Sequence, residues 1–265
     1  MSGNSAFEMV SERGWRRGLG NMLKNELASW WKTRMWWIQC LIWVGLIGLM
    51  FGAVLFGAPD PPPSEEVTML FSIFTGLFPA VGVVIIMQGA VVGEKNSGTA
   101  AWVLSKPISR PAFILSKVAA NSLGVLATMV LLPGIVSYAM HTVAAGNQWN
   151  LPGFLAAMGV IFLNNFFFLS LTLMLGTLFS SRGPVIGIAL ALLFMQQNLL
   201  GLLPALRYVL PWNLVIPIGQ EQMDAVVPCL LLGLHSYSPL LVGTVALESI
   251  LFILIGLYRF SREEF

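Results

Sequence analysis

A series of long apolar blocks is the feature that most constrains this chain. A helix needs about 20 residues to cross a hydrocarbon core about 30 Å thick, and six blocks reach that length. They occupy residues 38–56, 69–92, 118–140, 154–179, 185–203 and 240–257. Only 10% of the 265 residues are charged, against about 25% in a soluble domain. The sequence therefore predicts an all-α membrane protein with six transmembrane helices, and it excludes a soluble enzyme, a disordered chain and a disulfide scaffold.

Basic residues lie almost entirely in alternate connectors. Of the 14 Lys and Arg residues, thirteen lie before the first block, after the sixth, or in the connectors that follow the second and fourth blocks. The remaining one, Arg207, follows the fifth block. By the positive-inside rule, we expect a multi-pass protein of the cell membrane with both termini cytoplasmic.

Charged residues are rare inside the blocks. Glu248, in the sixth block, is the single formal charge in their interiors. Lys117 precedes the third block by one residue, and we expect its ammonium to extend along the helix to the membrane interface.

The segment 19–37 precedes the first block and has helical periodicity. Its apolar residues recur at spacings of three and four, and it ends in a cluster of tryptophans. This pattern predicts an amphipathic helix that lies in the cytoplasmic interface. The alternative is a plain extension of the first transmembrane helix.

The segment 204–239 separates the fifth and sixth blocks. It contains an apolar run, 225–234, which is too short to cross a bilayer, and several prolines that interrupt it. We expect a broken helical hairpin that re-enters the outer leaflet, with Glu221 and Asp224 in water near its start.

Signatures of catalysis and metal binding are absent from the sequence. His141 and His235 have no neighbouring Cys, His, Asp or Glu at the spacing of a metal site. The stretch 89–96 is one residue short of a phosphate loop, and neither Ser nor Thr follows Lys95. We therefore expect no catalytic residue, no metal site and no bound cofactor in this chain, and no nucleic-acid partner.

The connector 93–110 is the most informative polar segment. Glu94 suits the first turn of a short helix, residues 100–104 tolerate helix, and Pro107 ends it. A helix held between two membrane spans can transmit a force from a partner to the spans. The alternative is a linker without a special role. We expect Glu94 and Gly98 at exposed sites, and three side chains turned toward a partner or lipid: Trp102, Val103 and Leu104.

This connector also carries a motif. Its order is Glu94, Gly98, Thr99, Leu104, Pro107, Ser109, Arg110 and Lys117. The order resembles the E-x-x-x-G-T, L, P-x-S-R and K signature of the type-2 ABC exporter permeases, in which the segment after the second span forms the coupling helix. The expected interfacial helix, six spans and broken hairpin are also similar to that family. The resemblance therefore covers nearly the whole chain, although the large extracellular domain of some relatives is missing.

The resemblance implies that residues 1–265 form a single permease domain, the transmembrane subunit of an ATP-driven exporter. Its partners would be a P-loop ATPase subunit, a second permease copy or paralogue, and membrane lipid. ATP and Mg would bind the partner, so this chain is not expected to be an enzyme. The residues implied in coupling to the ATPase are Glu94, Gly98, Thr99, Trp102, Leu104, Pro107, Ser109 and Arg110.

Consecutive amide side chains in the fifth block are candidates for the transport pathway. Gln196, Gln197 and Asn198 together cover most of a helix circumference, so at least one must face protein or a wet cavity. Because the second and fifth spans line the pathway in the resembling family, Gln88 of the second block joins them as a candidate cargo contact.

Two other functions remain open at this level. A secondary transporter could use Glu248 to carry a coupling proton, and a non-transporting subunit could simply anchor an ATPase. The connector motif and the lack of an intramembrane basic partner for Glu248 favour the ABC permease.

Overall fold

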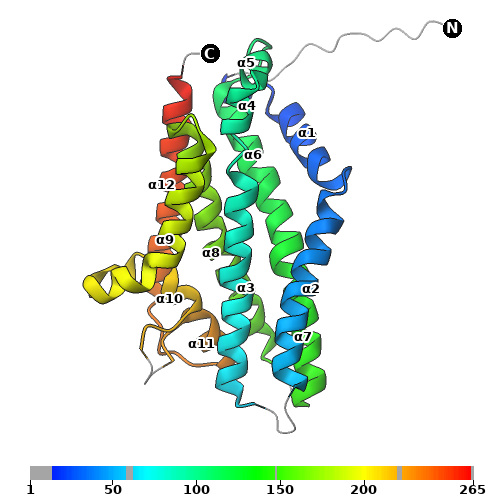
Figure 1. Ribbon diagram of the computed structural model, residues 1–265, viewed down its shortest axis with the longest axis vertical. Helices are drawn as coiled ribbons and strands as arrows, with labels where there is room; N and C mark the ends of the chain where they lie inside the picture. The colour runs from blue at the N-terminus through cyan, green and yellow to red at the C-terminus, as the bar shows by residue number, and fades with distance from the viewer. Residues whose placement is uncertain (1–13, 58–61, 147, 220–222, 264–265) are drawn as a thin grey trace, which may run out of the picture.

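The computed structural model describes residues 14–57, 62–146, 148–219 and 223–263, and within these ranges it contains helices and no strand. Its long helices run side by side as an upright bundle (Figure 1). They are α2 (Met35–Phe56), α3 (Ser64–Met87), α6 (Arg110–Val125) with α7 (Leu132–Ala145), α8 (Leu151–Leu178), α9 (Arg182–Leu202) and α12 (Pro239–Ser261). Counting α6 and α7 as one, these six helices are long and apolar enough to cross a membrane. The predicted number of spans is confirmed.

Short helices gather at the two ends of the bundle (Figure 1). One end, here called the connector end, holds η1 (Gly14–Arg16), α1 (Leu19–Trp31), α4 (Val92–Asn96), α5 (Thr99–Leu104) and the last turn of α12. Toward the other end, here called the hairpin end, lie η3 (Pro204–Tyr208), α10 (Trp212–Val215) and α11 (Val226–Leu232). Glu221 lies outside the described residues.

All of the long helices begin before their apolar blocks, and α3 and α6 do so by the most residues. Glu65 and Glu66, which precede the second apolar block, lie in the first turn of α3, where carboxylates are favoured by the helix dipole. The third long helix begins at Arg110 rather than at residue 118, because Ser109 caps it by accepting a hydrogen bond from the Ala112 N–H at 3.2 Å. Hydropathy did not detect the start of α3 because its first turn is polar. It did not detect the start of α6 because Lys117 interrupts the apolar residues that follow Arg110.

The predicted N-terminal amphipathic helix is present but shorter. It ends at Trp31, and residues 35–37 belong to the first turn of α2. α1 packs mainly against α6 rather than continuing α2, so it is not a plain extension of the first span.

The helix formed by α6 and α7 is continuous but widens in the middle. Residues Leu126–Leu131 form a π-helix, η2, after which the Leu132 N–H donates to the Ala127 carbonyl, five residues back. Pro133 follows and has no N–H to donate, which removes an α-helical hydrogen bond at this point. Such π turns are frequent at functional sites.

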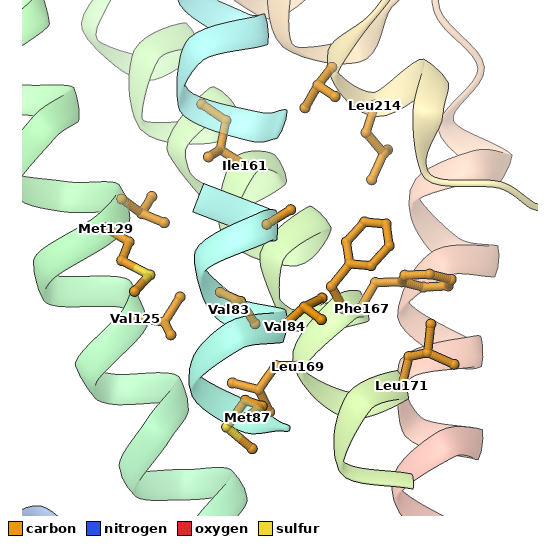
Figure 2. Packing of buried hydrophobic residues seen from close by; sticks show 14 of the residues in the cluster. Val83, Val84, Met87, Val125, Met129, Ile161, Phe167, Leu169, Leu171 and Leu214 are labelled. Carbon is orange, nitrogen blue, oxygen red and sulfur yellow. The ribbon is translucent and has the colours of Figure 1, made fainter. Parts of the chain in front are cut away.

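The core is centred on α8, whose most apolar stretch is 67% buried, against 22% for those of α2 and α12. Figure 2 shows Ile161 and Leu169 of α8 in one cluster with buried residues of α3 and of the α6–η2 helix. Val83 and Met87 of α3 and Met129 of η2 are also buried there. The outer helices therefore leave long apolar faces uncovered within this chain.

Candidate coupling site

The connector after α3 folds as two short helices instead of the single one expected. α4 ends at Asn96, and α5 begins after Gly98, whose φ of +72° is in the left-handed region. Open space surrounds the position of a Cβ at Gly98, so glycine is required there by backbone conformation rather than by crowding. The turn directs α5 away from the bundle, where it forms the extremity of the connector end (Figure 1).

An ion-paired triad joins α4 to α1 and α6. Lys117 Nζ lies 2.7 Å from Glu26 Oε1 of α1 and also donates to Glu94 Oε1 of α4. The Lys117 side chain is 3% exposed. The expectation that Lys117 extends to the membrane interface is therefore wrong, because two carboxylates inside the helix contact satisfy its ammonium. Glu94 is likewise a bonded, half-buried residue and not an exposed one.

Lys95, the next residue of α4, reaches the opposite side of the bundle. Its Nζ lies 2.5 Å from Glu263 Oε1, just after α12, and 3.4 Å from the carbonyl oxygen of Thr177 near the end of α8. Adjacent charged residues of α4 thus connect it to four other helices.

Arg182, the first residue of α9, packs over the junction of α3 and α4. A Cβ at Gly93 would lie 3.1 Å from Arg182 Nη2, and one at Gly89 would lie 3.7 Å from its guanidinium carbon. These two glycines therefore leave room for the guanidinium, and α9 begins in contact with the connector.

The end of the connector is held by hydrogen bonds to backbone carbonyl groups. Ser109 donates through Oγ to the Trp15 carbonyl at 2.5 Å and through its N–H to the Arg17 carbonyl at 2.9 Å. Arg110 Nη1 donates to the carbonyls of Ser261 at 2.7 Å and Glu263 at 2.6 Å. These bonds fasten the segment before α1 and the C-terminal end of α12 to the start of α6.

The outward surface of α5, here called the tip, consists of Gly98, Thr99, Trp102, Lys106 and Pro107, all exposed. Trp102 is 62% exposed, and Lys106 Nζ lies 3.4 Å from the centre of its ring. Tryptophan is enriched among the residues that contribute most to protein–protein binding, so Trp102 is a candidate contact for a partner.

Val103 and Leu104 differ from the expectation of exposure. Both are half-buried against the core. The residues of the motif therefore divide into two groups. Those turned inward are Glu94, Leu104, Ser109, Arg110 and Lys117, and those turned outward are Gly98, Thr99 and Pro107. Trp102, which is not part of the motif, is also turned outward.

The four candidate pathway residues do not gather in one place. Gln88 lies directly after α3 at the connector end, whereas Gln196 lies about 20 Å along α9 toward the hairpin end. Gln196 is buried, donates to the Leu193 carbonyl at 3.2 Å and leaves its Oε1 without a described partner. Gln197 and Asn198 are exposed on the outside of α9.

Glu248 is half-buried on α12 and forms no hydrogen bond or ion pair with the described residues. Among the described residues, no group of three or more His, Cys, Asp or Glu side chains could hold a metal ion.

The sequence does not indicate the partners of the motif. Glu26, Lys95, Arg182 and Glu263 complete the contacts of the connector, yet no local pattern connects them with it. The one available signal was a cation beside an apolar block, since a buried Lys117 would require a carboxylate from elsewhere in the chain.

Comparison with protein families gives this site its context. A family model described as ABC-2 family transporter protein matches residues 20–265. The chain belongs to this family. A comparison with curated proteins found no match. The protein is therefore an ABC transporter permease, a multi-pass membrane subunit of a family whose members lack the ATPase site.

Proposed function

We propose that this permease is the transmembrane subunit of an ATP-driven exporter and that its tip docks on a separate P-loop ATPase, which binds ATP and Mg. The observation that carries the proposal is the division of the connector into an exposed tip and a bonded part, here called the base, which consists of Glu94, Lys95, Ser109 and Arg110. A segment that only linked two spans would not need both.

The base provides routes by which a push on the tip could reach the membrane spans. Through Lys117, a displacement of α4 would move α1 and α6. Through Lys95 it would move α8 and α12, and through Arg182 it would move α9. Nucleotide-dependent closure of the ATPase would favour one of two packings of the bundle by binding one of them more tightly. The π-helix η2 is a place where the α6–α7 helix could adapt.

The same proposal fixes an orientation. The connector end, with both described chain ends and most of the basic residues, faces the cytoplasm. α1 then lies at the cytoplasmic interface, and the segment with α10 and α11 folds back into the outer leaflet.

A second permease copy or a paralogue completes the transporter. Gln197 and Asn198 lie on the outside of an apolar helix, where lipid would leave their amides without hydrogen-bond partners. A second permease packed against this face of α9 would satisfy them and would place Gln196 close to the interface.

Docking is tested by measuring the affinity of the purified permease for the P-loop ATPase that co-purifies with it. Trp102→Ala should weaken binding about 30-fold, because a tryptophan at an interface hot spot contributes about 2 kcal/mol or more. Gly98→Val should also weaken binding, because valine disfavours a positive φ. Pro62→Ala, before α3 at the hairpin end, is the matched control. Unchanged affinity for both tip variants would refute the docking surface.

A further inference from the structure

α1 has two faces of different character. Its buried face carries Trp30, which donates through Nε1 to Asn121 Oδ1 at 3.0 Å and covers Gly124 of α6, where a Cβ would lie 2.5 Å from the ring. A second face lines an open hollow of about 370 Å³. The residues of this face are Gly20, Leu23, Lys24, Leu27, Ala28, Trp31 and Lys32.

The hollow combines an apolar floor with positive charge. Leu23, Leu27 and Trp31 provide the apolar surface, while Lys24 and Lys32 are exposed and form no ion pair with a described residue. No acidic side chain lines it. The site therefore suits a ligand that carries both hydrocarbon and negative charge.

The surroundings continue this surface toward the first membrane span. The rings of Trp31 and Trp36 lie 6.5 Å apart, and Met35, Trp36 and Trp37 are exposed at the start of α2. Tryptophans with this mixture of polar and apolar surface are enriched where a membrane meets water. Because α2 begins only a few residues after α1 ends, the hollow lies beside the edge of the bilayer.

We propose that this face of α1 binds an anionic phospholipid. The acyl chains lie against Leu23, Leu27 and Trp31, and the headgroup phosphate is within reach of Lys24 and Lys32. The proposal depends on the membrane location of the chain and not on coupling to an ATPase, so the two can fail separately.

The test measures quenching of tryptophan fluorescence in the full-length permease by brominated phosphatidylglycerol and brominated phosphatidylcholine. The wild type should bind phosphatidylglycerol more tightly, and the Trp31→Phe variant should lose part of the quenching. Lys24→Gln and Lys32→Gln should each reduce the preference about fivefold at low salt, because a basic residue near an anionic surface contributes about that factor. About 0.5 M salt should reduce the wild-type preference by screening. Arg259→Gln, an exposed residue of α12 away from the hollow, is the matched control.

Equal binding of the two lipids by the wild type would overturn the proposal. An unchanged preference in the Lys24→Gln, Lys32→Gln double variant would overturn it as well. If that double variant instead lost binding of the ATPase in lipid-free detergent while its lipid preference stayed intact, the face would belong to the ATPase and the lipid site would be wrong.

Discussion

The two ends of the bundle are stabilised by different interactions. At the connector end, the side chains of Lys95 and Lys117 make the only ion pairs among the described residues. At the hairpin end, aromatic rings surround Trp149, with His141 stacked at 4.1 Å and Phe71 at 5.0 Å. Ion pairs depend on a few directed contacts that can be exchanged, whereas a packed aromatic cluster resists change. The movement that we propose would therefore begin at the connector end.

Close packing continues from the aromatic cluster into the segment after α9. Ser72 of α3 donates to the Val215 carbonyl at 2.6 Å, and a Cβ at Gly76 would lie 2.5 Å from the Val215 side chain. Cys229 of α11 is fully buried, and this burial raises the pKa of its thiol. The thiol should therefore stay protonated at neutral pH. These contacts fix α10 and α11 onto the bundle.

The largest effect on stability is expected from Trp149→Ala. Removing a buried aromatic side chain costs about 3–5 kcal/mol, and Trp149 is 6% exposed. Trp102→Ala is the matched control, because an exposed tryptophan should change stability by less than about 0.5 kcal/mol. Denaturation in mixed micelles measures both.

The variant with the larger effect should be the other one when ATPase binding is measured instead of stability. Folded Trp149→Ala protein should bind the ATPase as the wild type does, whereas Trp102→Ala should not. If Trp149→Ala weakened docking as much as Trp102→Ala, the two ends could not be treated as separate.

A smaller loss is expected from Lys117→Met, which leaves two neighbouring carboxylates without their cation. Loss of one member of a fully buried pair costs about 3–5 kcal/mol. Glu26 and Glu94 are 17% and 29% exposed, so we expect about 2–3 kcal/mol. Glu94→Gln should cost about 1 kcal/mol, since Lys117 keeps Glu26. The same denaturation experiment checks this order, and equal losses in the two variants would show that the triad does not act through Lys117.

The sequence was sufficient to predict the membrane spans, because crossing a membrane depends on the length and hydropathy of a segment, and both are local properties. It was also sufficient to locate the connector, since the motif from Glu94 to Lys117 is nearly continuous. It did not give the direction of each side chain. Glu26 and Lys117 are 91 residues apart, and no local pattern indicates that α1 turns back onto α6.

Other features were hidden for related reasons. Trp149 lies in a short uncharged connector that gave no signal, yet it is the centre of the aromatic cluster. The break at Gly98 was missed because one glycine within a helix-tolerant stretch does not by itself predict a positive φ. The outward position of Gln197 and Asn198 depends on how α9 packs, which three adjacent amides cannot specify.

We propose that docking and transmission use different parts of one connector. The most direct test is ATP hydrolysis by the partner ATPase in proteoliposomes, measured with wild-type and Glu94→Gln permease at saturating ATPase. Glu65→Gln, an exposed residue of α3 at the hairpin end, is the control. We expect the Glu94→Gln permease to bind the ATPase within about twofold of the wild type, yet to lose part of the permease-dependent stimulation. A neutral amide replaces the carboxylate that pairs with Lys117, whereas the contacts of Lys95 and Arg182 remain. Wild-type stimulation by a folded Glu94→Gln permease would contradict the proposal.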